Sequence, residues 1–106
     1  MNALPIKKLF CTTLNVKEGA QKMQERFLMA RVIGEYIVSL RWSKGIRQKD
    51  LCVLAQISQL TLRRIEKGQV QINVYTLSRI VAALDENMVD FWIKIEKIMQ
   101  LMKKNA

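Results

Sequence analysis

The chain has 106 residues, half of them hydrophobic, and 18 basic against nine acidic side chains give it a formal net charge of +9. This length suits one small domain with a single core, and no apolar run approaches the roughly 18 residues that cross a bilayer. There is no histidine, and Cys11 and Cys52 stand far apart, which excludes the usual zinc sites. No grouping of nucleophile, base and carboxylates predicts an enzyme, and we expect no cofactor.

The first 18 residues are predicted to form an N-terminal arm, either a short strand or an ordered extended segment, ahead of one domain over residues 19–106. Pro5 argues against an early helix, and the β-branched pair Thr12 and Thr13 favours extended backbone. Lysines interrupt the apolar residues here, so the segment lacks the long apolar stretch of a secretory signal. We therefore expect a soluble protein in the reducing environment of the cytoplasm.

From about Lys17 to Trp42, apolar residues recur at intervals of three and four, which predicts helix. The residues in this pattern are Met23, Phe27, Ala30, Ile33 or Gly34, Ile37 and Leu40. The spacing fits either one long helix or two consecutive helices. A break follows at residues 43–45, where glycine and serine interrupt the pattern.

Residues 47–68 are the most informative segment, because they predict two short helices joined by a tight turn. The first helix is expected over Gln48–Ala55, after which Gln56 breaks the helical pattern. The residues expected on its inward face are Leu51, Leu54 and Ala55.

The second helix of the segment is predicted over Gln59–Lys67. Ser58 can accept a hydrogen bond from the free N–H groups of the first turn, and Gly68 can end the helix in a left-handed conformation. Its inward residues are Leu62 and Ile65, with Ile57 beside them. The residues left for the outside are Gln59, Leu60, Thr61, Arg63 and Arg64. A short helix with so polar an outer face is typical of one that enters the major groove of DNA.

The segment resembles the helix-turn-helix of the phage-repressor family, the Cro, lambda-repressor or XRE type, over about residues 33–92. The matching positions are Ile33, Gly34, Glu35, Ile37, Leu40, Arg41, Gln48, Leu51, Ile57, Ser58, Ile65, Glu66, Lys67 and Gly68, then Thr76, Leu77, Ile80, Ala83, Leu84, Phe91 and Trp92. The resemblance implies an all-α fold, a five-helix lambda-repressor-like DNA-binding domain with an N-terminal arm and an extended C-terminal helix. The positive charge suits a polyanion, although surplus lysine and arginine can also serve solubility alone.

Three residues depart from the family pattern. Cys52 stands where the family has a small buried residue, so we expect a core thiol. Gln56 stands where a turn glycine is common, so either Gln56 accepts a strained left-handed conformation or the turn has another shape. Arg47 replaces the usual serine or threonine cap, which removes a cap but adds a cation beside the expected phosphate path.

The resemblance also implies which side chains meet DNA. Gln59, Leu60 and Arg64 match the positions that face base edges: Arg64 suits guanine, Gln59 suits adenine, and Leu60 suits a thymine methyl group. The expected phosphate partners are Lys44, Arg47, Gln48, Thr61, Arg63 and Lys67. Glu66 is expected to have a structural role.

Beyond this segment, Asn73 is predicted to cap a helix over Val74–Leu84, and a last helix follows at about residues 88–103. Residues 85–106 carry no net charge. The last helix has a wide apolar stripe formed by Val89, Trp92, Ile95, Ile98, Met99 and Met102. We predict that this stripe is a homodimer interface; the alternative is a lid over the helices of the same chain.

These features together predict a sequence-specific regulator of transcription that binds double-stranded DNA as a homodimer on an inverted-repeat operator. The alternative is an antitoxin or adaptor of a two-protein module, which binds a protein partner and autoregulates its own promoter. The N-terminal arm and the methionine-rich last helix keep this alternative open, because methionine faces adapt to different partners.

Overall fold

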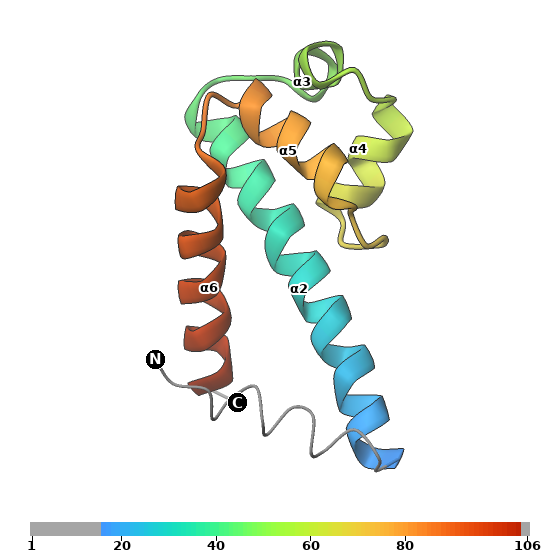
Figure 1. Cartoon of the computed structure of the whole chain (residues 1–106). Helices are drawn as coiled ribbons and strands as arrows, with labels where there is room; N and C mark the ends of the chain where they lie inside the picture. Colours follow the sequence, from blue (N-terminus) through green and yellow to red (C-terminus); the bar gives the residue numbers. More distant parts are fainter. Residues whose placement is uncertain (1–15, 105–106) are drawn as a thin grey trace.

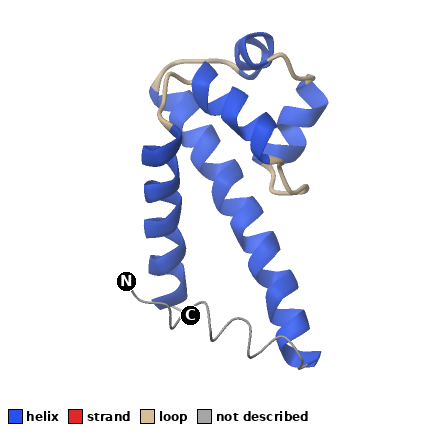
Figure 2. Cartoon of the chain, viewed as in Figure 1, coloured by secondary structure: helices blue, strands red, loops and turns tan. Residues whose placement is uncertain are grey.

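The computed structural model describes residues 16–104, and within this range the chain forms only helices and loops (Figure 2). The helices, labelled in Figure 1, are α2 (Val16–Ser43), α3 (Gln48–Ala55), α4 (Gln59–Glu66), α5 (Val74–Ala83) and α6 (Met88–Lys104). The predicted all-α architecture of five helices is therefore confirmed. Most of the predicted N-terminal arm, residues 1–15, lies outside the described residues, and α2 begins at Val16, inside the range assigned to the arm.

Helix α2 is one continuous helix of 28 residues rather than two consecutive ones. It packs against α4 and α6, while α3 and α5 pack against each other. In Figure 1, α2 and α6 meet near α5 and then diverge, so that the first turns of α2 run away from the other helices. No helix in the described part of the chain is both long and apolar enough to span a membrane.

Every helix contributes to one hydrophobic core. The largest side chains that are essentially inaccessible to solvent are Ile37, Leu51, Leu62, Leu77, Ile80, Val81, Leu84, Phe91 and Ile95. Burial of each such side chain stabilises the fold by roughly 1.5–3 kcal/mol. Phe91 of α6 also packs against Tyr36 of α2, with ring centroids 5.2 Å apart. The inner face of α6 therefore closes the core of its own chain, as the lid alternative proposed.

The inward face of α3 differs from the expected one. Leu51 and Ala55 are buried as predicted, and so is Cys52, but Leu54 is 61 % exposed. Helix α3 packs on both α4 and α5, so its buried arc is centred between Leu51 and Cys52, and Leu54 lies about 110° from that centre. Burial raises the pKa of the Cys52 thiol, and the nearby Glu66 carboxylate adds to the effect. Cys52 is thus a protonated core residue.

Helices α2 and α4 approach each other most closely at Gly34. A Cβ at this position would collide with the backbone carbonyl oxygens of Ile65 and Glu66 at the end of α4. The Ile65 carbonyl accepts a hydrogen bond from the Gly68 N–H, and the Glu66 carbonyl belongs to the same packed last turn of α4, so the backbone there has little room to move. The absence of a side chain at Gly34 therefore sets how near the end of α4 comes to α2.

We predict that Gly34→Ala lowers the free energy of unfolding by about 2 kcal/mol or more, because helix backbone must shift to admit the methyl group. Gly45→Ala is the matched control: Gly45 has a φ of +66° but open space around it, so only the left-handed penalty of about 1 kcal/mol applies. Urea titrations of both variants measure the difference. Equal losses would contradict a tight contact at Gly34.

Candidate nucleic-acid interface

The predicted helix-turn-helix consists of α3, the turn at residues 56–58, and α4. Gln56 has φ 58° and ψ 48°, a left-handed conformation, so Gln56 accepts the strain that a glycine would avoid. Arg79 of α5 supports this turn, because its Nη2 donates to the backbone carbonyl of Gln56 at 2.9 Å and to its Oε1 at 3.1 Å. The Arg79 guanidinium also lies 5.3 Å from the centre of the Tyr75 ring. A side chain of α5 therefore holds the turn ahead of α4.

Helix α4 begins at the predicted N-cap. The backbone N–H of Thr61 donates to the Ser58 hydroxyl at 3.1 Å, and that hydroxyl donates to Thr61 Oγ1 at 2.8 Å. Leu62 and Ile65 are buried, as expected. The helix ends at Glu66 with Lys67 as its C-cap, one residue earlier than predicted, and Gly68 follows with φ 69°.

The three predicted base-contacting residues share the exposed outer side of α4. Gln59, Leu60 and Arg64 are all exposed, and Leu60 presents its apolar side chain to solvent. Arg63 is exposed beside them. Within the described residues, neither Arg63 nor Arg64 forms an ion pair with an acidic side chain. Both guanidinium groups are thus available to an external anion or base edge.

Two predicted phosphate partners lie where α3 begins. Gln48 Nε2 donates to Glu66 Oε1 at 2.6 Å, which fixes the side chain but leaves its second amide N–H free of that bond. Arg47 is the N-cap of α3 without a side-chain cap, and its Nε lies 3.1 Å from Asp50 Oδ2. The loss of a cap at Arg47, expected from the sequence, is confirmed.

The remaining predicted phosphate partners differ in availability. Lys67 is exposed next to the end of α4, and the Thr61 hydroxyl can still donate although it accepts from Ser58. Lys44 instead places its Nζ 3.0 Å from Glu86 Oε2 in the loop before α6. A phosphate would have to compete with that carboxylate for Lys44.

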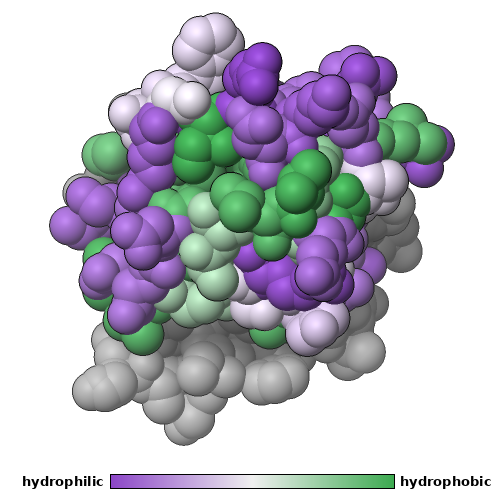
Figure 3. Space-filling model, turned by 90° about the horizontal axis from the view of Figure 1, so that it is seen from above, coloured by the Kyte–Doolittle hydropathy of each residue, from purple (hydrophilic) through white to green (hydrophobic). Residues whose placement is uncertain are grey.

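Seen from the α3 end, the molecule shows a group of apolar side chains ringed by hydrophilic ones (Figure 3).

A buried network behind α3 and α4 was only partly foreseen. Glu66 has the expected structural role: Arg41 donates to its two carboxylate oxygens, at 2.9 Å from Nε and 3.3 Å from Nη2. Arg41 Nη1 donates to the Ile46 carbonyl at 3.1 Å. Together with the bond from Gln48, these contacts tie the end of α4 to α2 and to the start of α3. No local sequence signal indicates a pair separated by 25 positions.

The residues of the predicted dimer stripe fall on two sides of α6. Ile95 and Met99 are buried inside this chain, so they do not face outward. Ile98 is partly buried against the core. Val89 and Trp92 are exposed on the outer side together with Ile93, which was not among the predicted contacts. Met102 is also exposed, but it lines a hollow beside α2 instead. The outer apolar surface of α6 is therefore centred on Val89, Trp92 and Ile93.

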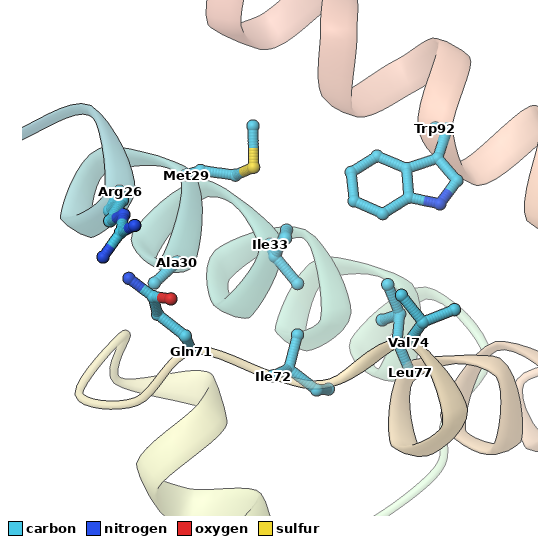
Figure 4. A pocket seen from close by; sticks show the side chains of 9 residues that line it. All are labelled: Arg26, Met29, Ala30, Ile33, Gln71, Ile72, Val74, Leu77 and Trp92. Atoms are coloured by element: carbon cyan, nitrogen blue, oxygen red, sulfur yellow. The ribbon is translucent and has the colours of Figure 1, made fainter. Parts of the chain in front are cut away.

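An apolar groove of about 170 Å³ adjoins this surface. Figure 4 shows that Trp92 forms one wall, that α2 forms another, and that the loop after α4 and the start of α5 complete it. The lining residues are Arg26, Met29, Ala30, Ile33, Gln71, Ile72, Val74, Leu77 and Trp92.

Comparisons with known proteins agree with this geometry. A family model described as helix-turn-helix matches residues 37–91. An uncharacterized HTH-type transcriptional regulator of Haemophilus influenzae is 34 % identical over 86 residues, which cover 81 % of this chain and 79 % of that protein. The fold is also similar to the crystal structure of the clp gene regulator ClgR from Corynebacterium glutamicum, with a TM-score of 0.68, 22 % identity, and coverage of 73 % of this chain and 82 % of the other. A mutant of the restriction-modification controller protein C.Esp1396I has a TM-score of 0.64 at 21 % identity, with coverage of 68 % and 91 %.

The buried network predicts that Glu66→Ala lowers the free energy of unfolding by about 3–5 kcal/mol, because it leaves the Arg41 charge buried without its partner. Asp50→Ala is the matched control, since it breaks the exposed Arg47 pair and should change stability by less than about 1 kcal/mol. Thermal and urea unfolding of the two variants provide the measurement. A small loss for Glu66→Ala would mean that water reaches the Arg41 guanidinium.

Proposed function

The chain belongs to the helix-turn-helix family of the phage-repressor or XRE type, and we propose from this premise that it is a sequence-specific regulator of transcription, acting in the cytoplasm as a homodimer on an inverted-repeat operator. The observation that carries the proposal is the outer side of α4. It presents Gln59, Leu60 and Arg64 on a helix whose two ends are held by Ser58 and Glu66. A capped, well-positioned helix with base-reading side chains suits the major groove.

The three side chains offer different base contacts. Arg64 can place its planar guanidinium against the O6 and N7 acceptors of guanine, and Gln59 can make paired bonds to adenine. Leu60 can meet the methyl group of thymine. Because Arg64 is the only one of the three that carries charge, it should both discriminate between base pairs and attract the negatively charged DNA.

The sugar-phosphate backbone would be held from both sides of α4. Gln48 and Arg47 stand at the start of α3, where free backbone N–H groups add to the attraction for a phosphate. Thr61 and Arg63 would act from α4 itself and Lys67 from its C-cap, and Lys44 would contribute once it leaves Glu86. These contacts fix orientation and provide salt-dependent affinity without reading sequence.

We propose that the dimer forms through the outer surface of α6. Val89, Trp92 and Ile93 carry this proposal, because their side chains are exposed, apolar and on one side of the helix. Ile98 and Met102 are left out, since they line a hollow together with residues of α2. Ile95 and Met99 are left out, since they are buried in the core of each chain. A single recognition helix reads only a few base pairs, so a two-fold pair would double the site, with half-site centres roughly 34 Å apart.

The groove beside Trp92 favours a second candidate, an antitoxin or adaptor that regulates its own promoter. The groove is apolar and opens next to the outer surface of α6, which suits a hydrophobic side chain of another protein. Purification from the native host separates the candidates. A second protein in fixed stoichiometry that survives high salt supports the adaptor, and recovery of a homodimer alone supports the free-standing regulator.

The proposed base contact of Arg64 and phosphate contact of Lys67 predict different changes in DNA binding when each residue is replaced by alanine. On a duplex selected from a random library, Arg64→Ala should weaken binding by about 1–3 kcal/mol and relax preference at one base pair per half-site. Lys67→Ala should weaken binding to selected and scrambled duplexes alike and make the salt dependence shallower by about one charge per monomer. Titrations at several salt concentrations measure both effects. Equal losses on both duplexes for Arg64→Ala would assign it to the backbone instead.

The proposed interface predicts that Ile93→Glu raises the dimer dissociation constant at least about tenfold, because a charge would be buried at its centre. Leu101→Glu is the matched control, since Leu101 is an exposed apolar residue of the same helix that lies off the Val89, Trp92 and Ile93 surface. Sedimentation velocity over a range of concentrations measures both. Point changes are preferable to truncation, which would remove Met99 from the core. An unaltered dimer in Ile93→Glu would place the interface elsewhere.

A further inference from the structure

Trp42 is the most exposed of the large apolar side chains described in this structure, with 74 % of its surface accessible. It stands in the last turn of α2, directly after the buried Arg41. The core does not use this indole. An aromatic side chain presented in this way offers a large apolar face to a partner at little conformational cost.

The indole borders a hollow of about 190 Å³ between the end of α2 and the start of α3. Arg47 also lines this hollow, and its side chain is 81 % exposed. The residues that line the hollow are Arg41, Trp42, Gly45, Ile46 and Arg47. The site therefore combines an apolar aromatic wall with a guanidinium that is largely in solvent.

The hollow lies beside the proposed DNA-binding surface. Trp42 directly follows Arg41, whose guanidinium binds Glu66 at the end of α4, so the hollow starts next to that contact. Arg47 is followed by Gln48, and Gln48 and Arg41 both bind Glu66. The hollow thus continues the surface formed by the start of α3 and the end of α4.

We propose that this hollow receives the DNA backbone just outside the bases read by α4, with the Trp42 indole packed on a deoxyribose and the Arg47 guanidinium on the adjoining phosphate. This inference rests on the proposed function, because it requires α4 to lie in the major groove. A deoxyribose presents C–H groups that suit an apolar ring, and a phosphate suits a guanidinium. Arg47 can exchange Asp50 for the phosphate at little loss, because an exposed ion pair contributes little.

The proposed contact has a distinct signature in binding experiments. An indole on a sugar reads no base and releases no counterion, so Trp42→Ala should weaken binding to selected and scrambled duplexes alike, by about fivefold per monomer, with an unchanged salt slope. Lys67→Ala, in contrast, should change the slope. Trp42→Phe should restore part of the lost affinity, because phenylalanine keeps an aromatic face.

A direct test uses the full chain labelled with 5-fluorotryptophan. The chain has two tryptophans, so ¹⁹F spectra should show two resonances, and the one missing from Trp42→Phe belongs to residue 42. A saturating duplex that extends several base pairs beyond the half-sites should move this resonance, whereas a duplex that stops at their outer edge should move it much less.

Two results would overturn the inference while leaving the proposed function intact: a Trp42 resonance that does not move when the long duplex binds, or one that moves with protein concentration before DNA is added. The second result would assign Trp42 to contact between copies of the chain. If neither duplex binds at all, the proposed function fails together with the inference.

Discussion

The buried ion pair between Arg41 and Glu66 is the interaction on which the DNA-binding surface depends. Both side chains are almost fully shielded from solvent, and removal of two charges from water is expensive unless hydrogen bonds compensate. Here they do, because Arg41 also donates to the Ile46 carbonyl and Glu66 also accepts from Gln48. The pair thereby joins the end of α2, the loop before α3, the start of α3 and the end of α4. It orients the parts that would contact bases and phosphates relative to each other.

The turn between α3 and α4 is also held by a side chain from outside the motif. Helices α3 and α4 have eight residues each, too few to be stable in isolation, so their geometry must come from tertiary contacts. Arg79 of α5 binds the strained Gln56 at the turn, and Arg41 of α2 binds Glu66 at the far end. Side chains from outside the motif therefore fix both ends of α4. This matters for function, because a planar contact between an arginine and a guanine tolerates little rotation of its helix.

Features encoded by neighbouring residues could be predicted from the sequence, and features that depend on distant contacts could not. The caps at Ser58 and Asn73 and the stop at Gly68 are local, so the limits of α3, α4 and α5 came within a residue of those observed. The outer face of α4 could also be predicted, because the inward-facing residues of this helix follow the helical repeat and leave the others outside. The carboxylate partners of Gln48 and Lys44 come from remote segments, and no spacing rule reveals them.

The errors on α3 and α6 have one physical cause. A helical repeat shows that a stripe is apolar but not which part of it meets the rest of the chain. On α3 the contact with both α4 and α5 turned Leu54 outward, and on α6 the wide stripe was divided between two surfaces. Ile95 and Met99 close the core, while Val89 and Ile93 stay exposed.

Trp92 stands where these two surfaces of α6 meet, which connects the proposed partner surface with the segment next to the proposed DNA contacts. Its indole forms a wall of the groove, and Gln71 and Ile72, in the loop after α4, form part of the opposite wall. A second copy or another protein that filled this groove would therefore touch the segment that follows the recognition helix. A partner changes DNA affinity only to the extent that it binds one arrangement of that loop better than another. Both proposed functions thus bring a second protein chain to Trp92, and they differ in which protein that chain is.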